Sequence, residues 1–289
     1  MLSLNTERDN QDLERVVKIL EFPIFTAKAA KYIGKPFELA LMALPDPVLN
    51  KVGDYTQACL KTALQVVLFT VNKEKRFKKA NNLLHKGMVV ATGAAGGFFG
   101  GVTMAAELPI STGIMMRSIA DVAREEGEDL TAVEPRLACI SVLGMDTSSK
   151  AKKTEGINTS KYFIIRNAMA AEVTKATEYL VANVITDESV PIVVKLLNNV
   201  TERFGIILTE KMAADLVPVV GAVSAASINY LFIDNFQRIA RGHFIVRRLE
   251  RKYGPERIKM GYEAILTRLN NRSQSDFYYS GEAAATSEE

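Results

Sequence analysis

The sequence predicts an all-α protein, a bundle of about nine helices around two central apolar helices rich in glycine and alanine. Three observations lead to this prediction. Apolar residues recur every three or four positions along most of the chain. The segments are separated by residues typical of helix starts and stops. No stretch shows the sustained alternation of apolar and polar residues that indicates a half-buried strand.

Two helical patterns precede residue 72. Thr6 is placed to cap a helix whose apolar stripe runs from Leu13 to Leu20. Asp46 as N-cap and Pro47 in the first turn predict the start of a second helix, which runs to about residue 71. Its buried face is expected to hold Leu60, Leu64, Val67 and Leu68.

The stretch from residue 87 to residue 106 carries no charge, and three of its glycines fall four residues apart. On a helix, Gly93, Gly97 and Gly101 form a face without side chains, against which another backbone can pack closely. Glu107 ends this run and Pro109 follows, so we expect Glu107 at the N-terminus of a further helix that stops near residue 127. Its apolar face holds Ile114, Met115, Ile119, Val122 and Ala123.

The second half continues the helical pattern. Thr131 and Glu134 have the spacing of a capping box. Residues 144–161 are polar and small and indicate a long loop, and helices are predicted at 162–184 and from residue 189 to residue 205. A second uncharged run, 216–233, continues as a charged helix to Gly254, and Pro255 opens a last helix. We expect the two uncharged runs to pack on one another at the centre.

The chain is divided into three parts: an N-terminal helical extension (1–44), a helical domain (45–271) and a disordered tail (272–289). Two cysteines, Cys59 and Cys139, suit a reducing compartment, and the charged N-terminus lacks a signal-peptide pattern. We therefore expect a cytoplasmic protein. With two histidines and two cysteines, a His- or Cys-rich metal site is excluded, although a carboxylate site is not. No metal and no cofactor are expected.

A basic cluster adjoins each uncharged run. Residues 73–86 hold six basic residues against one acidic, a net +5, and residues 238–259 hold eight against two, a net +6. This pattern is typical of proteins that bind an anionic membrane surface, and its simpler interpretation is a solvated helix face. The absence of a recognised motif and the sparse aromatic residues argue against nucleic acid. The candidate membrane-surface residues are Lys75, Arg76, Lys78, Lys79, Arg247, Arg248 and Arg251.

The uncharged runs themselves have three interpretations. They are a buried helical hairpin in a bundle, a segment that docks reversibly on a bilayer, or true membrane spans. The first run has the length of a span, but it is rich in glycine and alanine and lies beside helices of soluble character. A buried core is therefore favoured over docking, and docking over spanning.

Charged residues beside the apolar runs are the candidate site. Arg117, Asp121 and Arg124 lie three or four apart and can pair, and a buried Glu107 needs a partner. Asp234 and His243, nine residues apart, are expected near one helix face. Catalytic candidates are Glu107, Asp121, His85 and His243, and no nucleophile elbow, P-loop or zincin motif is present. Candidate binding residues are Gly93, Gly97, Gly101, Arg117, Asp234 and Arg238.

Several long segments together resemble the EcsC family over roughly residues 85–262. They are GAAGGFFGG, ELPISTGIMMRSIADVAREEGEDL, RLACISVLG, VPVVGAVSAASINYLFIDNFQ and ARGHFIVRRLERKYG. The resemblance implies a bacterial, mostly helical protein of undetermined biochemical activity, in a family named for a protein encoded beside an ABC transporter. This chain departs from the family at Ile110, Ser111 and Ile114. Asn235 also stands where the family commonly has a histidine, which counts against a catalytic role for that position.

Three functional hypotheses follow. The first is a cytoplasmic, membrane-associated protein, peripheral at the inner face of the membrane, that binds lipid or a membrane protein such as a transporter. The second is a hydrolase that acts on an apolar or lipid substrate between the central helices, with carboxylate and histidine side chains around the pocket. The third is a scaffold or regulatory subunit without a small-molecule site.

Overall fold

A computed structural model describes residues 4–22, 34–71, 101–147, 160–216 and 225–285 of the chain. Within these ranges every regular element is helical, so the predicted all-α bundle is confirmed. The helices are α1 (Glu7–Glu21), α3 (Lys35–Met42), α4 (Asp46–Leu49), α5 (Val52–Gln65), α7 (Gly101–Glu125), α8 (Val133–Ser141), α9 (Lys161–Ala182), α10 (Ser189–Leu196), α11 (Asn198–Leu216), α12 (Ala225–Tyr253) and α13 (Pro255–Ala285). A π-helical turn, η1 (Val66–Thr70), extends α5, and a 3-10 turn, η3 (Val142–Gly144), follows α8.

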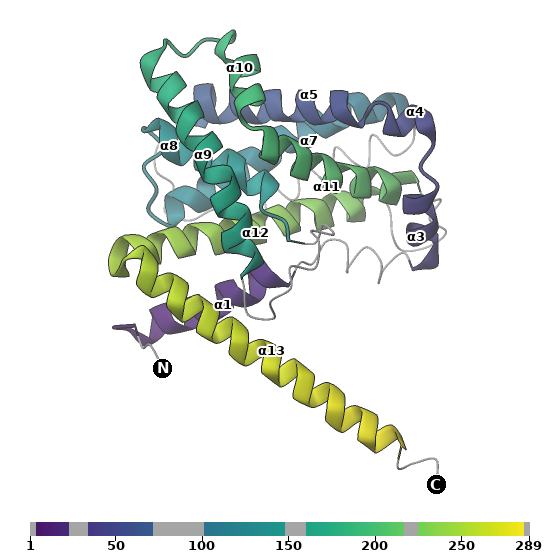
Figure 1. Cartoon of the computed structure of the whole chain (residues 1–289). Coiled ribbons are helices and arrows are strands. Elements are labelled where there is room, and N and C mark those ends of the chain that lie inside the picture. Colours follow the sequence, from purple (N-terminus) through teal and green to yellow (C-terminus); the bar gives the residue numbers. More distant parts are fainter. Residues whose placement is uncertain (1–3, 23–33, 72–100, 148–159, 217–224, 286–289) are drawn as a thin grey trace.

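Long helices run side by side through the body of the molecule. Helix α7 packs against α5 on one side and against α12 on the other, while α11 crosses α5 and α12 (Figure 1). Helix α9 packs on α8, and α1 and α13 lie against α12. Helices α3 and α4 cover the end at which α11 finishes and α12 begins, where a small second cluster of buried side chains joins them.

The predicted apolar faces are buried. The α1 stripe is in the main core, and so are the four residues expected on the second helix, Leu60, Leu64, Val67 and Leu68. Thr6 caps α1 as predicted, because its hydroxyl accepts a hydrogen bond from the Asp9 amide. Gly127 and Gly254 have positive φ angles after α7 and α12, which explains why glycine stops both helices.

Several local predictions were wrong. The helix predicted from residue 189 to residue 205 is two helices, α10 and α11, and Asp46 is the first residue of α4 and not its N-cap. Helix α7 continues through Pro109, so Glu107 lies inside a helix and not at an N-terminus. A proline inside a helix costs one hydrogen bond, which the packing of α7 between α5 and α12 outweighs here. Thr131 and Glu134 do not form a capping box. The amide and hydroxyl of Thr131 donate to the Asp129 carboxylate, and the Glu134 carboxylate accepts a hydrogen bond from Arg247.

The two ends of the chain show how the three proposed parts relate to the body. Helix α1 belongs to the main core, and its Leu20 lies so close to α12 that a Cβ on Gly242 would come within 2.9 Å of the leucine side chain. Helix α13 extends to Ala285, past the predicted helix end at residue 271, and Figure 1 shows it projecting from the body. Residues 87–100 of the first uncharged run, with Gly93 and Gly97, and residues 217–224 of the second lie outside the described residues; Gly101 is the first residue of α7.

Candidate functional site

Glu107 is part of a buried polar cluster that joins three helices. From α11, the Lys211 ammonium lies 3.3 Å from a Glu107 oxygen and 2.7 Å from an oxygen of Asp215. From α12, the Asn229 amide donates to Glu107 at 2.8 Å. Lys211 is completely buried. Lys211 and Asn229 are thus the partners that a buried Glu107 was expected to need.

This cluster, Glu107, Lys211, Asp215 and Asn229, holds two carboxylates and one cation. Burial and the nearby Glu107 charge raise the pKa of Asp215 above its ordinary value, although Lys211 opposes this. Burial alone would lower the pKa of Lys211, but Asp215 and Glu107 raise it, so the lysine is charged. Glu107 is the first charged residue after the uncharged run 87–106, and Asp215 is the last charged residue before the uncharged run 216–233. The cluster therefore fixes α7, α11 and α12 together where the two runs enter the bundle.

Asp121 has a separate set of partners. It forms an ion pair with Arg124 at 2.9 Å, and Arg124 also donates to the Val71 carbonyl at the end of η1. Fourteen residues separate Glu107 from Asp121 on α7, a distance of about 21 Å along a helix. Neither carboxylate lines the pocket that contains His243 or the pocket between α1, α7 and α12. Glu107 and Asp121 are therefore not brought together in one site, and His85 lies outside the described residues.

His243 lines a pocket of about 340 Å³ between α8, α9 and α12. Its lining combines apolar side chains with hydroxyl and charged ones. The apolar lining residues are Ala138, Met145, Met169, Ala170 and Val173. The hydroxyl groups are those of Ser141, Thr174 and Thr177, each of which donates its hydrogen to a carbonyl of its own helix.

His243 is only 2% exposed, and one of its ring nitrogens has no hydrogen-bond partner among the described residues. Its Nδ1 lies 2.9 Å from the Tyr162 hydroxyl, while Nε2 has no partner among the described residues. Burial and the charges of Arg166 and Arg247 hold the pKa of His243 well below its ordinary range, so the ring is neutral. Burial raises the pKa of Tyr162 to about 12, so its phenol keeps its proton.

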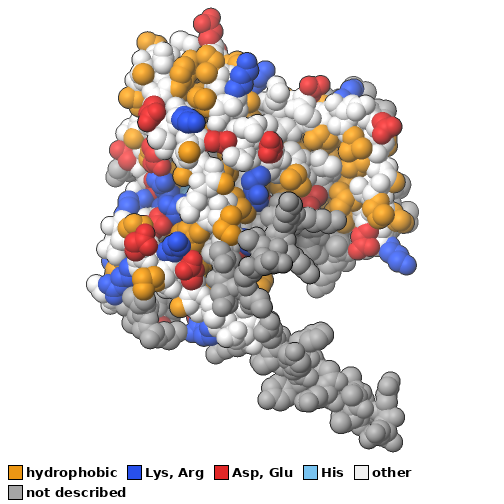
Figure 2. Space-filling model, in the orientation of Figure 1, with side chains coloured by type: hydrophobic (Ala, Val, Ile, Leu, Met, Phe, Trp, Pro, Cys, Tyr) orange, Lys and Arg blue, Asp and Glu red, His pale blue; other side chains and the backbone are white. Residues whose placement is uncertain are grey.

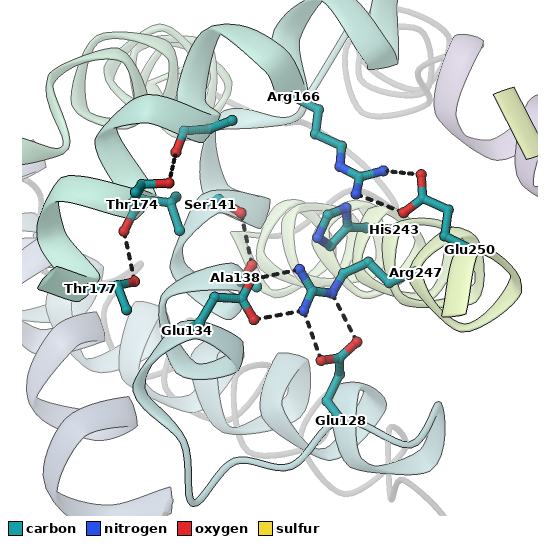
Figure 3. A network of polar contacts seen from close by, with 12 residues as sticks. Glu128, Glu134, Ala138, Ser141, Arg166, Thr174, Thr177, His243, Arg247 and Glu250 are labelled. Carbon is teal, nitrogen blue, oxygen red and sulfur yellow. Dashed lines mark hydrogen bonds and ion pairs between the residues drawn. The ribbon is translucent and has the colours of Figure 1, made fainter. Parts of the chain in front are cut away.

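Two ion-paired arginines flank this imidazole (Figure 3). Arg166 makes two hydrogen bonds of 2.7 Å to Glu250. Arg247 donates to Glu128 at 2.9 and 3.0 Å and to Glu134 at 2.8 and 2.9 Å. Burial opposes the charge of Arg247, yet the two carboxylates raise the pKa of the guanidinium above its ordinary value. The pocket therefore has a neutral histidine inside a frame of satisfied ion pairs.

The three arginines predicted for a membrane surface are all bound to carboxylates. Arg247 is described above, and Arg251 pairs with Glu128. Arg248 bonds to Asp9 and Asp12 of α1 and to Glu126 of α7, at 3.2, 2.6 and 2.9 Å. These arginines connect helices, and their charge is offset inside the protein. The four residues predicted for the other basic cluster, Lys75, Arg76, Lys78 and Lys79, lie outside the described residues.

The remaining candidates are spread over α7 and α12. Arg117, Asp234 and Arg238 are partly buried. Nine residues correspond to two and a half helical turns, so Asp234 and His243 project from opposite sides of α12, contrary to the expected common face. Asn235 is buried and donates to Asp146 at 2.5 Å, which gives it a structural partner.

Sequence reasoning missed the side chains that complete both sites. Lys211 follows the apolar residues Ile206 to Leu208 and is a single lysine in a buried helix, a signal that could have marked it as an ion-pair partner. Tyr162 and Arg166 occur in an alanine-rich helix with no motif, and no local signal connects them to His243, which is 81 residues from Tyr162.

The described helices offer neither a bilayer-spanning segment nor a group of three potential metal ligands among His, Cys, Asp and Glu. Neither the curated proteins nor the solved structures include a match to this chain. Residues 18–249, most of the chain, match the EcsC protein family. This range includes α7, α8, α9, α11 and nearly all of α12, the helices that build both polar sites. The chain therefore belongs to the EcsC protein family.

Proposed function

We propose that this protein is cytoplasmic and associates peripherally with an anionic membrane surface, where it binds lipid or a membrane-protein partner such as a transporter. The docking region is the α3–α4 end of the bundle, which we define as α3, α4, the last turns of α11 and the first turns of α7 and α12. The observation that carries this proposal is the group of exposed apolar side chains at this end.

Large apolar side chains are exposed on several elements of the α3–α4 end. Leu39 and Met42 of α3 are 63% and 86% exposed, and Leu49 of α4, Ile110 of α7 and Tyr230 of α12 are also exposed. Figure 2 shows apolar side chains gathered over α3 and α4 at the right of the view. Single exposed apolar residues are common, but a group shared by neighbouring helices is typical of an interaction surface.

Both uncharged runs meet the described structure at this same end. The run 87–106 leads into α7, and the run 216–233 leaves α11 and enters α12. The basic residues 73–86 directly precede the first run. Because Arg247, Arg248 and Arg251 of the other cluster are already paired with carboxylates, we assign the electrostatic attraction to residues 73–86. At an anionic surface, each free lysine or arginine contributes about 1 kcal/mol.

Flotation of the purified protein with vesicles tests this proposal. We expect it to float with phosphatidylcholine vesicles that contain phosphatidylglycerol and to float much less with phosphatidylcholine alone. Exchanging Lys75, Arg76, Lys78 and Lys79 for glutamine removes about 4 kcal/mol of attraction and should abolish binding at moderate salt. The variant Leu39→Ser/Met42→Ser should bind more weakly, because it removes apolar contact.

A matched control is available at the opposite end of the molecule. Val181 and Val184, at the end of α9 and just after it, are 71% and 83% exposed but adjoin neither uncharged run. The variant Val181→Ser/Val184→Ser should float like the wild type. The proposal fails if no vesicle binds at low salt, or if this control loses as much binding as the α3 variant.

A further inference from the structure

We propose that the pocket between α8, α9 and α12 binds an uncharged amphipathic molecule, with a carbonyl oxygen placed on Nε2 of His243 and an apolar chain on Met145, Met169 and Val173. This site is separate from the α3–α4 end, so it stands independently of membrane docking. Three features of the pocket indicate this ligand: the unpaired ring nitrogen, the charges that surround it and the polarity of the lining side chains.

Nε2 of His243 is a hydrogen-bond donor. The Tyr162 hydroxyl is buried, and Nδ1 of His243 is the only acceptor that it contacts among the described residues, so the phenol hydrogen is directed to Nδ1. Since the ring is neutral and Nδ1 accepts, the imidazole hydrogen lies on Nε2. A buried donor without a partner is rare, and Nε2 is the only buried side-chain nitrogen or oxygen without a hydrogen bond among the described residues that line this pocket. It requires an acceptor that the protein does not provide.

The charged groups around the pocket exclude an anionic ligand. The two guanidinium groups beside His243 are bound to Glu128, Glu134 and Glu250, as Figure 3 shows, and Glu178 adds a further carboxylate to the lining. A ligand carboxylate would have to displace one of these paired groups or lie beside it. Both are unfavourable for a buried charge. The acceptor on Nε2 is therefore an uncharged oxygen.

The hydroxyl and apolar side chains of the lining indicate the chemistry of the rest of the ligand. The hydroxyl groups of Ser141, Thr174 and Thr177 donate to helix carbonyls, so their oxygens remain available to accept hydrogen bonds. The methionine and aliphatic side chains of the same lining suit a flexible apolar chain of the ligand. A carbonyl next to hydroxyl groups, followed by an acyl chain, meets all three requirements. An ester of a fatty acid with a polyol has this structure.

Imidazole NMR of the full chain tests the site, because the chain has only two histidines. In the variant His85→Gln, His243 is the only imidazole. Its ¹⁵N spectrum should show the neutral ring with hydrogen on Nε2, unchanged between pH 8 and pH 5.5. Addition of 1-octanoylglycerol, below the concentration at which it aggregates, should shift the Nε2 signal saturably. Octanoate at equal concentration should leave it unchanged.

Two further variants, made in the His85→Gln background, distinguish the pocket from nonspecific binding. Ala170 lines the pocket from an exposed position on α9, and its neighbour Ala171 is exposed and does not line it. Ala170→Leu should weaken the interaction by about tenfold or more, while Ala171→Leu should leave it unchanged. The proposal is overturned if 1-octanoylglycerol causes no saturable shift, if Ala170→Leu binds as well as Ala171→Leu, or if octanoate binds equally. Flotation of the Ala170→Leu variant should equal that of the wild type.

Discussion

Replacement of Lys211 by methionine is expected to lower the free energy of unfolding by about 3–5 kcal/mol. Methionine fits the space of the lysine stem but leaves Glu107 and Asp215, whose side chains are only 13% and 10% exposed, without their cation. The uncompensated carboxylates must then be protonated or hydrated, and either change weakens the contact between α7 and α11. Urea unfolding followed by circular dichroism at pH 7 measures the loss.

The variant Glu107→Gln is the control for this prediction. It retains an oxygen that can accept from Asn229 and leaves Lys211 paired with Asp215 at 2.7 Å. We expect its stability to lie within about 1 kcal/mol of the wild type. If Lys211→Met is as stable as Glu107→Gln, the cluster does not hold the helices together and our assignment of its role is incorrect.

Replacement of Arg247 by methionine is the second large effect, a loss of about 3 kcal/mol. Arg247 makes hydrogen bonds to both Glu128 and Glu134, and the side chain of Glu128 is 3% exposed. Removal of the guanidinium leaves Glu128 with Arg251 alone. Thermal and urea unfolding of the variant should both report the loss.

Arg251→Gln is the matched comparison, because this arginine also pairs with Glu128 but is 44% exposed. We expect a change below about 1 kcal/mol for such a pair. Vesicle flotation at a temperature where both variants are folded should equal that of the wild type. A variant of Arg247 with unchanged stability and reduced vesicle binding would instead favour the membrane-surface role predicted from the sequence.

The helical architecture follows from local patterns in the sequence. The apolar spacing in α1, α5 and α7 identifies the buried faces, and Thr6, Gly127 and Gly254 mark helix ends by their own chemistry. Pro109 shows the limit of this reasoning. Its local preference predicts a helix boundary, but burial of both sides of α7 outweighs it.

The polar sites depend on pairings between distant residues, which a single sequence does not reveal. Basic residues 238–259 look like a free cationic surface because their partners, such as Asp9 and Glu128, occur more than 100 residues earlier. The same applies to Glu107, which lies 104 residues before Lys211. The local charge counts therefore identified the cationic residues correctly, but they did not reveal that carboxylates from distant parts of the chain pair with them.

Which end of the bundle meets the bilayer is the central question, and an environment-sensitive fluorophore addresses it directly. Met42→Cys and Val184→Cys offer labelling sites of similar exposure at opposite ends of the protein, 86% and 83%. The native Cys59 and Cys139 are both buried, and burial raises the pKa of the Cys59 thiol to about 11, so neither competes for the label at neutral pH. On addition of phosphatidylglycerol vesicles, we expect a blue-shifted, stronger emission from the label at position 42 and no change at position 184. A shift at position 184, or no shift at position 42 while the protein floats with the vesicles, would contradict docking through the α3–α4 end.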